Sequence, residues 1–301
     1  MKFRSNLTTE KQNPSSELID LKSTEEILHI INSEDEIVAH AVKKAIPQIS
    51  ETISFCVSAI KNGDRIFYLG AGTSGRLGVL DASEIPPTFS APSEWFTGVI
   101  AGGEKALRKS VEGAEDIPEN GIQDLKDAEI TKGDVIIGIS TSGAAVYVQS
   151  ALEYAQKIGA KTCYITCNPE PFYHVPADSI IKVETGSEII TGSTRMKAGT
   201  ATKMVLNMIT TTLMIKLNKT YGNLMVDLKA SNEKLWDRGT RIIQHLTDLS
   251  YDDSLKLLKS ADGEVKTAIV MEKLKMEAGD TREKLNENKG SLRKVLDGEL
   301  S

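Results

Sequence analysis

The sequence predicts an α/β protein built on a doubly wound parallel sheet and followed by a small helical C-terminal domain. Between residues 65 and 217, short apolar runs typical of strands alternate with amphipathic helical patterns, which is the chain order of a parallel sheet. The run 134–140 (DVIIGIS) is almost continuously apolar, as in a strand covered by helices on both faces. Beyond Tyr221 only helical patterns occur.

Residues 1–60 are expected to form a helical segment that packs on the sheet domain. A helical patch spans 24–31, and Ser23 and Glu26 have the spacing of a capping box at its start. Apolar residues then recur every three or four positions over 42–60, which predicts an amphipathic helix.

The sheet domain is assigned to residues 61–225 and the helical C-terminal domain to residues 226–301. The predicted strands are 65–69, 96–101, 134–140, 162–166 and 179–183. The helices predicted to alternate with them are 74–82, 105–113, 144–158 and 194–217. The helices predicted in the C-terminal domain are 233–245, 254–260, 265–274 and 281–296.

Composition restricts the class of protein and its partners. No apolar run approaches the ~20 residues that a membrane-spanning helix needs. The polar N-terminus lacks the apolar core of a secretory signal, so we expect a cytoplasmic protein that does not bind membranes. The net charge of −6 disfavours nucleic acid as a partner, because phosphate-backbone binding needs a basic surface. Three cysteines and four scattered histidines show no zinc spacing, so no metal site is predicted.

The first candidate ligand loop, residues 70–75 (GAGTSG), follows a predicted strand and opens a helix. Its spacing matches the dinucleotide pattern G-x-G-x-x-G, but a dinucleotide site favours an acidic residue about 20 positions further on, at the end of the next strand. The next predicted strand ends near Glu104, roughly 30 positions on, so the match is poor. Hydroxyl groups and free N–H groups at a helix N-terminus suit one compact phosphate instead, with Gly72, Thr73 and Ser74 as the binding residues. The alternative is a tight turn that Thr73 or Ser74 caps without any ligand.

A second hydroxyl-rich loop consists of Ser140, Thr141, Ser142 and Gly143, between the most apolar strand and the helix 144–158. One such loop could serve as a helix cap alone. Two of them, both at the carboxyl ends of parallel strands, lie where open α/β sheets bind ligands. Together they predict a site for a sugar phosphate or a similar small anion.

The stretch 186–203 (GSEIITGSTRMKAGTATK) is a third candidate. Ser193 and Thr194 can cap the helix that follows, and Arg195 and Lys197 bring positive charge to its first turns. Cations at a helix N-terminus oppose the helix dipole, so a bound anion explains them better than helix stability does. Solvated surface charge is the alternative.

Longer motifs carry a family resemblance. The stretches GAGTSGRLGVLDASEIPPTF, VEGAED, ITGSTRMKAGTATKMVLNMITT and YGNLMVDL resemble the bacterial N-acetylmuramic acid 6-phosphate etherases of the sugar isomerase (SIS) superfamily. The resemblance begins at LTTEKQNP, near Leu7, and extends to about Leu296. It implies a flavodoxin-like SIS sheet, a helical C-terminal part similar to a ubiquitin-associated fold, a homodimer, and no cofactor or metal.

The resemblance also implies a reaction and two catalytic residues. The reaction cleaves the lactyl ether of N-acetylmuramic acid 6-phosphate to N-acetylglucosamine 6-phosphate and D-lactate, within peptidoglycan recycling. Glu84 stands at the glutamate of the DASE motif, which is the family's proton donor, and Glu115 at the first acid of the GAED motif. Two carboxyl groups are sufficient: one removes the C2 proton of the open-chain sugar, one protonates the leaving oxygen, and water then adds to C3.

The second hydroxyl loop departs from the family pattern. Family members usually carry Ser-Gly-Arg-Thr-Pro there, whereas residues 142–146 of this chain are SGAAV. One hydroxyl and one cation are missing, which shifts the expected phosphate contacts toward Ser140, Thr141 and the Arg195 region.

Both glutamates are expected to have a raised pKa, because a carboxylic acid that works at pH 7 must titrate above the ordinary ~4.3. Glu84 and Glu115 each follow a predicted helix, and the negative end of a helix disfavours a carboxylate. Asp81 and Glu112, three positions before them, would add like-charge repulsion. The alternative is that both are surface acids at the starts of loops.

Two other functions stay open at this level. A non-catalytic sugar-phosphate sensor of the SIS type would keep the hydroxyl loops but would need neither Glu84 nor Glu115. A nicotinamide oxidoreductase is indicated only by Gly70, Gly72 and Gly75.

Overall fold

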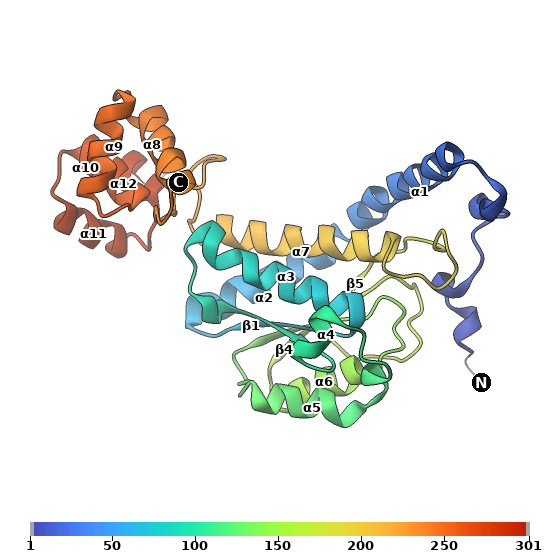
Figure 1. Cartoon of the computed structure of the whole chain (residues 1–301). Coiled ribbons are helices and arrows are strands. Elements are labelled where there is room, and N and C mark those ends of the chain that lie inside the picture. Colours follow the sequence, from blue (N-terminus) through green and yellow to red (C-terminus); the bar gives the residue numbers. More distant parts are fainter. Residues whose placement is uncertain (1–2, 299–301) are drawn as a thin grey trace. The chain divides into compact units, whose positions relative to one another are not determined.

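The computed structural model describes residues 3–298, which fall into two compact units (Figure 1). Unit 1 contains the chain up to Glu84 together with Ser93–Thr210, and unit 2 contains Ile85–Pro92 and the chain from Thr211 onward. Each unit has a buried apolar core of its own. Among the helices described, none has both the length and the apolar character needed to cross a membrane.

Unit 1 is built on a five-stranded sheet in which every strand is parallel to its neighbours, in the order β2-β1-β3-β4-β5. The strands are β1 (Ile66–Gly70), β2 (Phe96–Ile100), β3 (Val135–Ile139), β4 (Lys161–Thr166) and β5 (Ser179–Lys182). The predicted parallel, doubly wound sheet and its five strands are confirmed. This strand order is that of flavodoxin-like folds, in which ligands bind at the switch point between β1 and β3.

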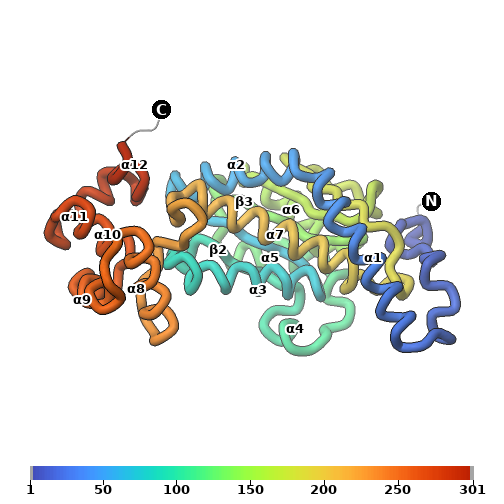
Figure 2. The backbone as a smooth tube through the Cα atoms, turned by 90° about the horizontal axis from the view of Figure 1, so that it is seen from above, coloured from blue at the N-terminus to red at the C-terminus, as the bar shows by residue number. Residues whose placement is uncertain are grey.

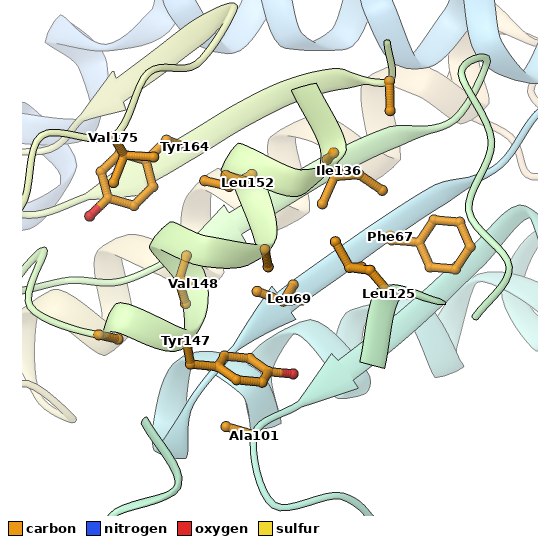
Figure 3. Packing of buried hydrophobic residues seen from close by; sticks show 14 of the residues in the cluster. Phe67, Leu69, Ala101, Leu125, Ile136, Tyr147, Val148, Leu152, Tyr164 and Val175 are labelled. Carbon is orange, nitrogen blue, oxygen red and sulfur yellow. The ribbon is translucent and has the colours of Figure 1, made fainter. Parts of the chain in front are cut away.

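Helices cover both faces of the sheet (Figures 1 and 2). One face carries α2 (Ile46–Asn62), α3 (Gly72–Phe89) and α7 (Lys197–Lys216), and the other carries α5 (Pro118–Asp127) and α6 (Val146–Lys157). Figure 3 shows the core on the second face, where Leu125 of α5 and Val148 and Leu152 of α6 pack toward Phe67 and Ile136 of the sheet. Coverage on both faces explains why β1 and β3 are buried along their whole length.

The sequence pattern does not predict α5, although this helix forms much of the second layer. The helix contains Gly121, which lowers helix propensity. A Cβ atom at Gly121 would lie 2.2 Å from the carbonyl oxygen of Tyr147 in α6. The glycine therefore permits a close approach of two helices, which local sequence cannot show.

The N-terminal part contains more helix than predicted. The capping box of Ser23 and Glu26 is present, but α1 extends over Thr24–Lys44. The pattern at 42–60 belongs to two helices, because α1 ends before Ala45 and Pro47 stands in the first turn of α2. Proline fits the first turn of a helix but not its interior, so it marks a new helix here.

The core of unit 2 consists mainly of helical residues, among which Ile243, Leu258 and Ile269 are fully buried, and the connection before the first of these helices adds the buried Val226. Its helices are α8 (Glu233–Thr247), α9 (Tyr251–Ser260), α10 (Val265–Leu274), α11 (Ala278–Glu287) and α12 (Leu292–Asp297). The prediction of one helix over 281–296 is wrong. Gly290 adopts positive φ, and the Ser291 side chain caps α12, so two helices form.

A buried ion pair joins α1 to the beginning of α7. The Nζ atom of Lys197, a residue only 1% exposed, donates to Oε2 of Glu34 at 2.5 Å. Asn13 donates its side-chain amide to the same carboxylate oxygen at 2.8 Å. Burial alone would raise the pKa of Glu34, but the bonds from Lys197 and Asn13 outweigh it and lower that pKa.

We expect Lys197→Met to lower the free energy of unfolding by about 3 to 5 kcal/mol, because it leaves Glu34 buried without its cation. The double variant Lys197→Met, Glu34→Leu should recover most of this loss, since it removes both charges. Arg241→Met is the control, because its ion pair with Asp237 is exposed to solvent and therefore adds little to stability. Urea denaturation followed by circular dichroism measures all three, and equal effects of Lys197→Met and Arg241→Met would contradict the assignment.

Candidate active site

Unit 1 contains a cavity of about 250 Å³ at the switch point between β1 and β3. In the register of the sheet, Gly70 lies opposite Ile139, so the loops that follow these two strands start side by side. Of the residues predicted from the sequence, those that line the cavity are Gly72, Thr73, Ser74, Glu115, Ser140, Thr141, Ser142 and Thr194. The structure thus brings residues from all three candidate stretches into one site.

The first loop contributes the N-terminus of a long helix. α3 begins at Gly72, so the N–H groups of Thr73 and Ser74 lie in its first turn, where no helical carbonyl is available to them. Both residues line the cavity, and Ser74 is buried. Free N–H groups, hydroxyls and the positive end of the helix dipole together favour an anion at this wall.

The second loop is rigidified by its own hydroxyl groups. Ser142 Oγ accepts the N–H of Ala144 at 3.3 Å, and Ser140 Oγ accepts the N–H of Ala145 at 3.5 Å. Gly143 forms the turn by donating its N–H to the carbonyl of Ser140 at 3.0 Å, and it does not line the cavity. Ala144 and Ala145 line the cavity at the two positions where the family resemblance led us to expect a cation and a hydroxyl.

The third stretch contributes less than predicted. Thr194 lines the cavity, whereas half-buried Ser193 and exposed Arg195 are not part of its wall. The prediction that Ser193 and Thr194 cap the following helix is wrong, because α7 begins at Lys197 and Glu188 accepts that residue's N–H at 3.0 Å. The charge of Lys197 is used in the buried ion pair with α1 and is not available to a ligand.

Glu115 lies in η6 (Ala114–Asp116), on the wall between the main cavity and a neighbouring one of about 280 Å³. Burial raises the pKa of its carboxyl group, and the charges of Asp116 and Glu112 raise it further, while Arg4 lowers it. The predicted direction is confirmed, but the helix-end explanation is wrong. α4 covers only Glu104–Arg108, so desolvation is the main cause.

Within one chain, Glu84 does not line this cavity. It is exposed on α3, 12 residues after Gly72, which corresponds to about 18 Å along the helix axis. α3 continues to Phe89, with its two prolines in the last turns, so the prediction of a helix end before Glu84 is wrong. Asp81 is buried and bonded to Lys203 Nζ at 2.6 Å, so its charge is compensated. One chain therefore does not bring Glu84 to the cavity that Glu115 lines.

The N-terminal segment contributes residues to the cavity that no sequence pattern predicts. Arg4, Leu7 and Glu10 line the cavity, and Arg4 is the one cationic residue among the described residues of its wall. Gly192 and Thr202 also line it. The available signal was the LTTEKQNP motif, which marks where the family resemblance begins but has no periodicity or spacing that assigns a role.

Comparisons with known proteins cover nearly the whole chain. Residues 48–156 match the glucokinase regulatory protein N-terminal SIS domain, residues 113–212 the SIS domain, and residues 222–277 the C-terminal lid domain of glucokinase regulatory protein. N-acetylmuramic acid 6-phosphate etherase 1 of Bacillus licheniformis is 48% identical over 290 residues, 96% of this chain and 95% of that protein. The etherase of Rhizobium rhizogenes is 48% identical over 290 residues, 96% of this chain and 94% of its own.

Solved structures with a similar fold are more distant in sequence. The phosphoheptose isomerase of Neisseria gonorrhoeae is 15% identical, with a TM-score of 0.46, and the match covers 64% of this chain and 99% of that one.

We expect Arg4→Ala to raise the pKa of Glu115 further, because it removes the cation that favours the ionised form. Glu112→Gln should shift the pKa in the opposite direction, since it removes a like charge. Titration of the Glu115 carboxyl carbon by NMR measures both shifts. Lys11→Ala is the control for a cation in the same segment, and a shift as large as that of Arg4→Ala would contradict a local effect of Arg4.

Proposed function

This chain belongs to the N-acetylmuramic acid 6-phosphate etherase family, and we propose that it is a carbon–oxygen lyase that cleaves the D-lactyl ether of N-acetylmuramic acid 6-phosphate. The products are N-acetylglucosamine 6-phosphate and D-lactate, and the reaction belongs to the recycling of peptidoglycan amino sugars. The observation that carries the proposal is the cavity in which Glu115, with its raised pKa, lies beside two hydroxyl-rich strand ends.

The phosphoryl group binds at the two strand-end loops. Thr73 and Ser74 offer hydroxyl and N–H groups at the start of α3, and the loop of Ser140, Thr141 and Ser142 offers hydroxyl groups from the other side. This arrangement supplies many hydrogen-bond donors and few cations. It therefore holds a compact anion mainly through directed hydrogen bonds and the helix dipole.

Elimination is the chemical route that this site can support. Alkoxide is a poor leaving group, but in the open-chain sugar the C1 aldehyde acidifies the hydrogen on C2. A base removes that proton, an acid protonates the lactyl oxygen as its bond to C3 breaks, and water then adds to C3. Burial makes the Glu115 carboxylate a stronger base than an exposed one, which suits the first step, and each well-placed group contributes about 100- to 10,000-fold.

The proposal includes a homodimer in which Glu84 of a second copy completes the site as the acid. Glu84 and Leu80 lie one helical turn apart on the exposed surface of α3, and the Leu80 side chain is 45% exposed. An exposed leucine beside a functional glutamate is suited to a contact with another protein chain. This arrangement reconciles the family role of Glu84 with its distance from the cavity in one chain.

Further assignments accompany this proposal. We propose the domain division 1–60, 61–225 and 226–301, with the last part similar to a ubiquitin-associated fold, and a cytoplasmic location. Elimination releases lactate, hydration adds water to C3, and two carboxyl groups transfer the protons without any net oxidation, so the reaction as written needs neither metal nor redox cofactor.

A sugar-phosphate sensor is the second candidate, since two of the matched domain models come from a regulatory protein. The decisive experiment supplies the purified protein with N-acetylmuramic acid 6-phosphate in heavy water and measures lactate and the product. We expect stoichiometric lactate release and deuterium at C2 of the N-acetylglucosamine 6-phosphate. Binding without lactate release would favour the sensor, and full retention of the original C2 hydrogen would exclude elimination.

Glu84→Gln and Glu115→Gln should each remove most lactate release, because each lacks one of the two proton-transferring groups. Mixing the two inactive variants under conditions that exchange subunits should restore about a quarter of wild-type activity, since half of the dimers are then mixed and each has one complete site. Mixing Glu115→Gln with itself is the control. If the mixture stayed inactive although mixed dimers had formed, Glu84 would not act across subunits.

A further inference from the structure

We propose that Glu10 is a third carboxylate of this site, which binds the sugar end of the phosphorylated amino sugar by accepting hydrogen bonds from its hydroxyl and amide N–H groups. The proposal rests on the proposed function for the identity of the sugar, but its test measures binding and not turnover.

Glu10 lies on the cavity wall together with Glu115. It is the last residue of η2 (Thr8–Glu10), and Leu7 and Arg4 from the same segment also line the cavity. Nothing in the spacing of the sequence pairs Glu10 with Glu115, because 105 positions separate them. The N-terminal segment therefore supplies one wall of the site.

Buried hydrogen bonds hold this segment in place at Thr9, which is completely buried. Asn168 Oδ1 accepts the N–H of Thr9 at 3.3 Å, and Asn168 Nδ2 donates to Thr9 Oγ1 at 3.1 Å. The same amide nitrogen donates to the carbonyl of Thr141 at 3.0 Å, and Gly192 donates its N–H to the carbonyl of Thr9 at 3.2 Å. Asn168 thus fixes Glu10 relative to the hydroxyl loop that holds the phosphoryl group.

Gly192 keeps the space beside the Glu10 carboxylate free. Its φ of +77° is accessible to glycine at little cost, and a Cβ atom there would lie 3.2 Å from Oε2 of Glu10. Gly192 itself lines the cavity. A side chain at this position would therefore both strain the loop and displace the carboxylate.

The chemistry of Glu10 determines which part of the ligand it meets. Across residues 3–298, no hydrogen bond or ion pair from protein satisfies its carboxylate, which is only partly exposed. An ionised carboxylate accepts hydrogen bonds and donates none, so it repels a phosphate and attracts hydroxyl and amide N–H groups. Because the phosphoryl group binds at the strand-end loops, Glu10 contacts the sugar part of the ligand and orients it.

Isothermal titration calorimetry with two ligands, N-acetylglucosamine 6-phosphate and inorganic phosphate, tests this assignment on the full-length protein. Glu10→Ala and Glu10→Gln should raise the Kd for the sugar phosphate about 10- to 100-fold, the loss expected when one or two hydrogen bonds to a charged group disappear. The Kd for inorganic phosphate should stay unchanged or decrease, because a negative charge has been removed. Glu17→Gln, an exposed glutamate of the same segment outside this cavity, is the matched control and should bind both ligands as the wild type does.

Gly192→Ala provides a second and independent variant. It keeps the Glu10 side chain but strains the loop and shifts the carboxylate by a few tenths of an ångström, so a smaller loss of sugar-phosphate binding than that of Glu10→Ala is expected. Equal weakening of both ligands by the Glu10 variants would show a structural role and overturn the proposal, as would an unchanged Kd for the sugar phosphate. A wild type that binds the sugar phosphate but releases no lactate would refute the proposed function alone, while a wild type that releases lactate but does not bind the sugar phosphate would overturn the assignment of Glu10 alone.

Discussion

The parallel pairing of β1 with β3 is the constraint on which the site depends. It places the carboxyl ends of two buried strands at the same edge of the sheet, with Gly70 opposite Ile139. Each of the two strands is followed there by a hydroxyl-rich loop, and the loop after β1 leads directly into the N-terminus of α3. The cavity forms between the two loops, because each loop supplies one of its walls. An anion bound there meets hydrogen-bond donors from both sides.

Two carboxyl groups of unit 1 differ in whether a cation pairs with them. Glu115 is desolvated beside Asp116 and Glu112 and has only Arg4 to offset them, so its pKa rises. Asp81 is buried more deeply, but Lys203 donates to it at 2.6 Å. The first group is a stronger base than an exposed glutamate, and the second is part of a structural ion pair. The difference is the presence of a cation within hydrogen-bond distance, not the extent of burial.

Buried polar contacts place the N-terminal segment on the rest of unit 1. Thr9 is bonded to Asn168, and Asn13 and Lys197 share the carboxylate of Glu34. Each of these groups is buried, so breaking one bond leaves an unsatisfied partner in a low-dielectric environment. Such contacts hold the N-terminal segment in one defined position. They suit a segment that must hold Glu10 in a defined orientation.

Local sequence determined the five strands and the two hydroxyl loops, because apolar runs and turn residues act over a few positions. The raised pKa of Glu115 comes mainly from burial, which the tertiary structure decided, and only its smaller part comes from the neighbouring acids. Local sequence could not show that α5 packs through Gly121, that Arg4 and Glu10 line the cavity, or that Glu84 lies on a distant part of α3. Those features arise from contacts between residues far apart in the chain. A periodic pattern reports which face of an element is buried but not which other element covers it, and only the tertiary structure decided that.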